Sequence, residues 1–107
     1  MYVMIYITAS NPEEAKYIGE EMVKARLAAC ANIIPEMSSV YWWEGEVERS
    51  DEAVLILKTK EEKVEAIVRR VKELHSYENP CVIAIPILKG SKEYLEWIDE
   101  ETEKEET

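Results

Sequence analysis

The sequence predicts an α+β fold, a ferredoxin-like βαββαβ sandwich with an antiparallel sheet and an extra C-terminal helix. Strand-like and helical patterns follow one another in the order β-α-β-β-α-β-α, which is the order of two split β-α-β units that share one sheet. The 107 residues suffice for one domain, and a content of 47% apolar and 34% charged residues is typical of a packed core. We therefore predict a single ferredoxin-like domain over residues 1–107.

The first strand and helix are marked by a change of hydrophobic period. Residues 2–7 form a continuous apolar run rich in β-branched and aromatic side chains, as expected of a central strand buried on both faces. Asn11 or Ser10 precedes Pro12, a pattern that predicts the start of a helix. Apolar residues at helical spacing then predict a helix that ends near Arg26.

The next segment predicts a strand and a hairpin. Residues 28–34 alternate between two faces and are expected to form the second strand, which Pro35 is expected to end. Residues 39–43 and 46–48 are the predicted hairpin arms, and residues 44–45, Glu-Gly, form the turn between them.

The second β-α-β unit follows the hairpin. Residues 53–57 are the predicted third strand, and residues 59–62 have the pattern of a capping box before a helix with an apolar stripe over residues 64–74. Residues 81–88 are the predicted last strand, and Pro86 within it predicts an edge position or a bulge. The sandwich places the first and third strands in the centre of the sheet and the other two outside.

The C-terminal segment is strongly acidic. Ser91 is expected to cap a third helix that carries Trp97 and Ile98. Residues 96–107 carry a net charge of −6 out of the −10 of the whole chain. Because like charges repel one another, we expect an acidic, frayed tail from about residue 100 to residue 107.

One face of the predicted sheet lacks a cover. The first strand is apolar on both sides, whereas the two helices of this sandwich cover one side only. Trp42 and Trp43 are adjacent in a strand and point to opposite sides, so they cannot both enter one core. Since an exposed apolar sheet of this size aggregates, the third helix or another subunit is expected to cover it.

Charge and composition exclude several partners. The chain outside the acidic tail has no basic excess, which argues against nucleic-acid and membrane-surface binding. Its apolar runs are shorter than the roughly 18 residues of a membrane helix. The two cysteines are expected to be free thiols in a reducing compartment, with the cytoplasm as the default. Abundant Glu and Lys with no Gln resemble the composition of heat-adapted proteins.

Known chemistries of this architecture are also excluded. An iron–sulfur cluster needs four cysteine ligands, and the chain has two. Residues 8–12, in the loop after the first strand, contain neither a Cys-x-x-Cys pair for a soft metal nor an Arg for an anion. One histidine and scattered serines do not make a recognisable nucleophile–base pair. We therefore predict no enzyme and no required cofactor.

Three residues are candidate metal ligands. Cys30 and Cys81 are the thiol donors that soft metals prefer, but each is also typical of a small buried residue in a strand. His75 is the only histidine and continues the apolar stripe of the second helix, so it is either a packed or capping residue or a ligand.

Five further residues are candidates for a ligand cleft. Lys58 extends a buried strand and could meet a carboxylate or phosphate, or simply pair with an acid. The aromatic candidates serve either as packing or as ligand contacts; they are Tyr41, Trp43, Tyr77 and Trp97.

Five segments together resemble the CutA family, which is named for divalent-cation tolerance. They read LAACANIIP over residues 27–35, YWWEG over 41–45, ILKT over 56–59, LHSYENP over 74–80 and YLEW over 94–97. The resemblance spans about residues 2–99. It departs at one position, because the family's usual His-Pro-Tyr is His-Ser-Tyr here, and we expect a looser turn at His75.

The resemblance implies a ferredoxin-like protomer in a tight homotrimer that binds copper or other divalent metals in the cytoplasm. Two hypotheses follow. In the first, the trimer is a divalent-cation tolerance protein, and Cys30, His75 and Cys81 must converge in space to hold the metal. In the second, the protein is a sensor or scaffold similar to the PII signalling proteins, and its intersubunit cleft binds a small molecule or a partner protein.

Overall fold

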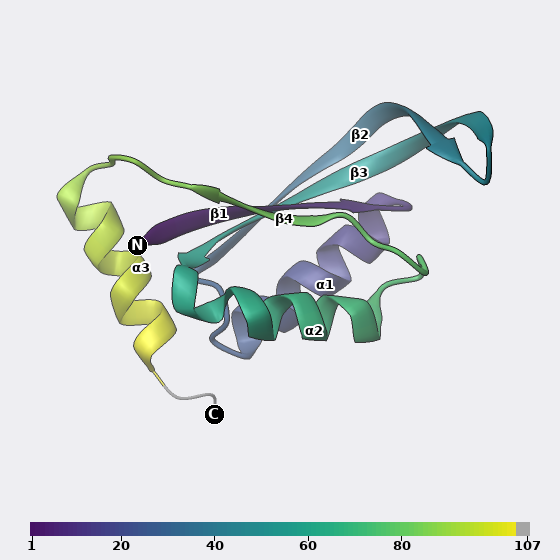
Figure 1. The fold of residues 1–107 in the computed structure, drawn as a ribbon. Helices are drawn as coiled ribbons and strands as arrows, with labels where there is room; N and C mark the ends of the chain where they lie inside the picture. The colour runs from purple at the N-terminus through teal and green to yellow at the C-terminus, as the bar shows by residue number, and fades with distance from the viewer. Residues whose placement is uncertain (105–107) are drawn as a thin grey trace.

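Over the residues that the structure describes, the chain folds as a four-stranded sheet with three α-helices (Figure 1). The structure is a computed structural model and describes residues 1–104. In chain order the elements are β1 (Tyr2–Ala9), α1 (Pro12–Lys24), β2 (Cys30–Trp43), β3 (Glu46–Lys60), the 3₁₀ turn η1 (Glu61–Lys63), α2 (Val64–Leu74), β4 (Val82–Pro86) and α3 (Lys92–Glu103). The predicted order of elements is confirmed.

The sheet has the predicted strand order. Its strands lie in the order β2-β3-β1-β4, and every neighbouring pair is antiparallel. β1 and β3 are central, and Pro86 lies at the end of the edge strand β4. An edge position suits proline, because no further strand needs its missing N–H.

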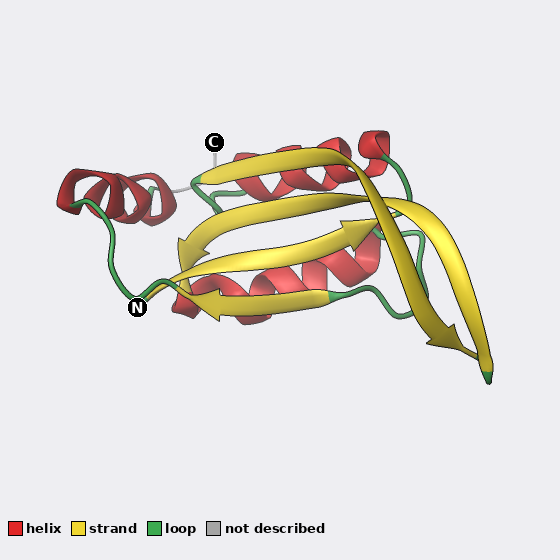
Figure 2. Cartoon of the chain, turned by 90° about the horizontal axis from the view of Figure 1, so that it is seen from above, coloured by secondary structure: helices red, strands yellow, loops and turns green. Residues whose placement is uncertain are grey.

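The helices α1 and α2 cover the same face of the sheet, as Figure 2 shows. Asn11 caps α1 through its side chain, and Pro12 is the first helical residue, both as predicted. The core lies between these helices and the inward side chains of β1 and β3; it includes Val3, Ile5, Ile7, Ile18, Met22, Leu55, Leu57, Ile67 and Val71. Gly19 permits the close approach of α1, because an added Cβ would lie 3.0 Å from Leu55 and 3.1 Å from Ala31.

Two sequence predictions are wrong in the middle of the chain. Pro35 does not end the second strand. It lies where the pairing of β2 with β3 is irregular, between Ile34 and Met37, and β2 continues beyond it to Trp43. The predicted capping box at residues 59–62 does not form either. Thr59 is buried in β3, and its hydroxyl donates to the Leu27 carbonyl at 2.6 Å.

The acidic C-terminal segment is more ordered than predicted. Ser91 caps α3 as expected, but the helix continues to Glu103 instead of fraying near residue 100. Thr102 is buried, and its hydroxyl donates to the Ile98 carbonyl at 2.7 Å. Arg26 forms an ion pair with Glu101 at 2.7 Å. The prediction of a frayed tail is therefore wrong for residues 100–103, and residues 105–107 lie outside the described residues.

The second face of the sheet carries no helix along most of its length. α3 lies beyond one end of the sheet (Figures 1 and 2), where the Lys58 ammonium stands 5.5 Å from the centre of the Tyr94 ring. The Tyr2 hydroxyl donates to Asp99 in the same region. Three isoleucines stay exposed elsewhere on this face: Ile34, Ile83 and Ile85. We call it the open face.

Candidate functional site

The two thiols lie on the open face but at opposite corners of the sheet. Cys30 begins β2 and pairs with Lys58, whereas Cys81 directly precedes Val82, the partner of Ile7. The two positions are four residues apart in the direction of the strands and three inter-strand spacings apart across the sheet. At ordinary strand dimensions the separation is roughly 20 Å, so one chain cannot use both thiols on one metal ion.

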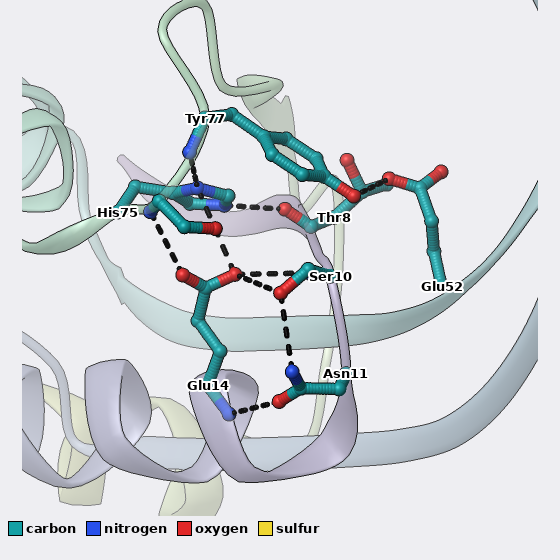
Figure 3. Close-up of polar contacts among 8 residues, drawn as sticks. Thr8, Ser10, Asn11, Glu14, Glu52, His75 and Tyr77 are labelled. Atoms are coloured by element: carbon teal, nitrogen blue, oxygen red, sulfur yellow. Dashed lines mark hydrogen bonds and ion pairs between the residues drawn. The ribbon is translucent and has the colours of Figure 1, made fainter.

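His75 is held by both of its ring nitrogens (Figure 3). Its Nε2 lies 2.7 Å from the Thr8 carbonyl oxygen, and its Nδ1 lies 3.0 Å from the Tyr77 backbone nitrogen. Because a carbonyl only accepts and an N–H only donates, Nε2 carries the proton and Nδ1 accepts. The ring has no lone pair left for a metal, and the residue caps the C-terminus of α2. The three predicted ligands therefore do not meet within one chain.

Glu14 supports the turn that follows His75. Its carboxylate accepts hydrogen bonds from the backbone N–H and hydroxyl of Ser10 and from the backbone N–H of Ser76, the last at 2.8 Å. Burial acts to raise the pKa of Glu14, but these hydrogen bonds outweigh it and hold the pKa below its ordinary value. The turn is thus anchored by an N–H that the family's usual proline lacks, and the expected looseness at His75 is absent.

A buried carboxylate lies beyond this turn. Glu52 is 9% exposed, and one of its oxygens accepts a hydrogen bond from the Tyr77 hydroxyl at 2.8 Å (Figure 3). Burial and this hydrogen bond raise the pKa of Tyr77. Burial and the charge of Glu52 also raise the pKa of the Cys81 thiol. Cys81 is consequently a protonated thiol at neutral pH, and a metal would have to displace its proton.

These groups line a cleft on the open face, between the β2–β3 hairpin and the loop after α2. The cleft has a volume of about 890 Å³. Three of the predicted cleft residues line it, namely Tyr41, Trp43 and Tyr77, and so does Cys81. The other lining residues include Tyr6, Thr8, Met37, Ser38, Ser39, Glu52, Ser76 and Asn79.

Two predicted cleft residues lie elsewhere. Lys58 is near α3, under the Tyr94 ring. Trp97 and Cys30 line a second, smaller groove beside α1. Sequence reasoning missed Glu52, although it has a sequence signal. Glu52, Val54 and Ile56 are alternate residues of β3, so their side chains point to the same face of the strand. An acid that shares a face with apolar residues indicates a buried charge.

The chain matches the family model of the CutA1 divalent ion tolerance protein over residues 3–101. It belongs to the CutA1 family. The divalent-cation tolerance protein CutA of Archaeoglobus fulgidus is 48% identical over 103 residues, which are 96% of this chain and 100% of that protein. The CutA protein of Thermus thermophilus is 41% identical over 95% of this chain and 99% of its own length.

Solved structures of CutA1 proteins have the same fold. The structure from Archaeoglobus fulgidus, described as a periplasmic divalent cation tolerance protein, superposes with a TM-score of 0.93 at 46% identity and covers 95% of this chain and 99% of that one. CutA1 from Oryza sativa superposes with a TM-score of 0.91 at 42% identity, over 94% and 92% of the two chains. The predicted fold class and family are confirmed.

Two further observations concern residues 1–104 of this CutA1 chain. They contain no group of three or more His, Cys, Asp or Glu side chains placed to hold one metal ion. None of the helices in this range has the length and hydropathy needed to cross a bilayer.

Proposed function

We propose that this CutA1 protein acts in divalent-cation tolerance as a homotrimer that binds copper or another divalent metal ion with donors from more than one chain. The observation that carries this proposal is membership of the divalent ion tolerance family over residues 3–101. The relatives carry the name of tolerance proteins and not of enzymes, which agrees with a binding function.

The positions of the donors support a shared site. Cys30 and Cys81 are the thiol donors of the chain, both are partly exposed, and they lie at opposite corners of the open face. Because a closed structural metal site uses four ligands, donors must come from neighbouring chains or from water. Such a site is open and weak, and folding of the protein does not require metal.

Exposed apolar surface supports the trimer. Ile83 and Ile85 lie two residues apart on the edge strand β4, point to the open face and are 54% and 44% exposed. Contiguous apolar surface of this kind marks protein–protein contact in soluble proteins. Burial of this surface stabilises an assembly by about 25 cal/mol per Å².

A reducing compartment fits the same chemistry. Cys30 and Cys81 are free thiols and are too far apart to form a disulfide within a chain. Cytoplasmic placement keeps such thiols reduced and available to soft metal ions.

Light scattering and calorimetry test this function. We expect a mass of three chains at micromolar concentration, an unfolding temperature unchanged by a chelator, and weaker copper binding in Cys30→Ser and Cys81→Ser at equal trimer content. Glu65→Gln, an exposed change on α2, is the matched control. The mass of one chain would refute the trimer, and undiminished copper binding in both cysteine variants would refute the thiol site.

The cleft supports a second candidate function, the binding of a small molecule in a sensor or scaffold role. Its volume of about 890 Å³ lies in the range of small-molecule sites. Glu52, Tyr77 and the hairpin aromatics give it both polar and apolar walls.

A further inference from the structure

We propose that Arg26 is a latch that ties α3 to the turn after α1, and that α3 is a strap whose docking is controlled by charge. Arg26 has a backbone conformation that favours glycine, and its guanidinium reaches Glu101, 75 residues away, in the last turn of α3. The combination of a strained backbone with this distant ion pair carries the proposal. All of its contacts lie within one chain.

The turn after α1 is of a kind that usually contains glycine. The Leu27 N–H donates to the Met22 carbonyl at 3.0 Å, and the Arg26 N–H donates to the Val23 carbonyl at 3.1 Å, which is the pattern of a Schellman motif. This motif requires a positive φ at the position of Arg26, where φ is 62°. A side chain is disfavoured there because its Cβ approaches the following carbonyl oxygen. The backbone alone would therefore be more stable with glycine at position 26.

The side chain of Arg26 offsets this strain. Its Nη1 lies 2.7 Å from a carboxylate oxygen of Glu101 and 3.3 Å from the Glu101 backbone carbonyl oxygen. That carbonyl belongs to the last turn of α3, where carbonyls have no partner within the helix. Residues 100–103 carry three acids and no base, so like charge accumulates at the negative end of the helix dipole. Arg26 brings a positive charge from another element to this end of α3.

Further polar contacts of α3 with the sheet have the same direction of charge. The Lys60 ammonium at the end of β3 lies 3.9 Å from Asp99 and 3.6 Å from Glu103. The Tyr2 hydroxyl at the start of β1 donates to Asp99. In these contacts a donor from the sheet meets an acid of α3. The docking of α3 therefore depends on the ionised state of its acids.

Acid should loosen the strap. Hydrogen bonds from Lys104 and from Arg26 hold the pKa of Glu101 below its ordinary value of 4.5. Only the share from Arg26 is lost when α3 leaves, because Lys104 belongs to the same segment as Glu101. The undocked state then binds more protons at Glu101, so this contribution to docking is present above pH 4.5 and is lost as the pH falls through the docked pKa. Glu96 and Glu103 are the other charges near the Tyr2–Asp99 contact.

A double-mutant cycle on the assembled protein tests the latch. Urea unfolding compares the parent, Arg26→Gly, Glu101→Ala and the double variant at one chain concentration. In the Glu101→Ala background the ion pair is already absent, so Arg26→Gly should relieve strain and raise the unfolding midpoint. In the parent background the same change also removes the ion pair, so the midpoint should rise less or fall. Glu44→Gly, at another residue with a positive φ of 48°, should have the same effect in both backgrounds.

Hydrogen exchange of residues 92–104 tests the strap. At about pH 7, where these carboxyls are ionised, we expect exchange about fivefold faster in Arg26→Gly and in Glu101→Ala, and no faster still in the double variant. Glu100→Ala, an exposed change in the same turn, should exchange as the parent does. Sodium chloride at about 1 M, where the Debye length is about 3 Å, should speed exchange more in the parent than in Arg26→Gly.

Contrary outcomes are specific to each part of the proposal. An equal effect of Arg26→Gly in both Glu101 backgrounds would overturn the latch, because the strained backbone would then have no link to α3. Unchanged exchange of residues 92–104 in both single variants would overturn the strap and leave packing as the force that holds α3. Exchange in Glu100→Ala as fast as in Glu101→Ala, or exchange that salt leaves unchanged in the parent, would overturn the control by these charges.

Discussion

The Nε2 of His75 lies 2.7 Å from the carbonyl oxygen of Thr8, although 67 residues separate them in the chain. This contact ties the end of α2 to the end of β1. It also fixes the position of Tyr77, whose backbone N–H donates to Nδ1 of the same ring. Tyr77 in turn reaches Glu52 in the cleft. His75 therefore acts as a structural support of the cleft.

His75→Ala should destabilise the protein by about 3 kcal/mol, because it leaves the Thr8 carbonyl and the Tyr77 N–H without partners in a buried place. Denaturant unfolding measures the loss, and Glu73→Ala, an exposed change two residues earlier, is the control. Copper binding by folded His75→Ala should equal that of the parent. A drop in copper affinity at full stability would contradict the structural role.

The depressed pKa of Glu14 predicts a dependence of stability on acid pH. In the unfolded chain Glu14 titrates near its ordinary value of 4.5, and in the folded chain it titrates lower. The unfolded state thus binds more protons, so this contribution is fully present above pH 4.5 and is lost as the pH falls through the folded pKa.

Glu14→Gln should remove that dependence in part. Between pH 6 and pH 3, the unfolding free energy of Glu14→Gln should fall less than that of the parent. These two pH values lie on the order of 1.5 pH units above and below the ordinary carboxyl pKa. Chemical unfolding at both pH values gives the comparison, with Glu65→Gln as the control. Parallel curves for Glu14→Gln and the parent would show that Glu14 contributes nothing to acid sensitivity.

Ser76→Pro tests the anchoring N–H directly. The backbone of His75 has φ −78° and ψ 144°, which the residue before a proline readily adopts, and a proline at position 76 cannot donate to Glu14. Ser76→Ala keeps the N–H. We expect Ser76→Pro to be about 1 kcal/mol less stable than Ser76→Ala at pH 7, with a smaller difference once Glu14 is protonated. Equal stability at both pH values would mean that this hydrogen bond has no net effect.

The end of α3 should contribute to stability. A chain that stops after Ile98 loses the buried Thr102, the Arg26–Glu101 ion pair and the Tyr2–Asp99 hydrogen bond. We expect its unfolding free energy to fall by about 2 kcal/mol, whereas a chain that stops after Lys104 should match the full chain in stability and mass. Thermal unfolding with light scattering decides the matter, and identical unfolding of the two shortened chains would show that residues 99–104 are not stabilising.

Local patterns in the sequence determined most of the fold. The periods of the apolar residues gave the order of the elements, and Asn11, Pro12 and Ser91 marked helix starts that the structure confirms. These signals succeed because helix capping and strand alternation depend on neighbours in the chain. The five family segments, read together, also predicted the CutA1 family that the comparisons establish.

Tertiary contacts decided the rest. The sequence around Thr59 predicted a helix cap, but its hydroxyl donates a hydrogen bond to the carbonyl of Leu27, 32 residues away in the chain. Arg26 forms an ion pair with Glu101 at the end of α3. The like charges of this segment, taken alone, predict fraying instead of this ordered contact. Cys30 and Cys81 are separated, and Glu52 and Tyr77 are joined, by strand register and loop placement. Distances between residues far apart in sequence depend on how the whole chain packs, so no local pattern encodes them.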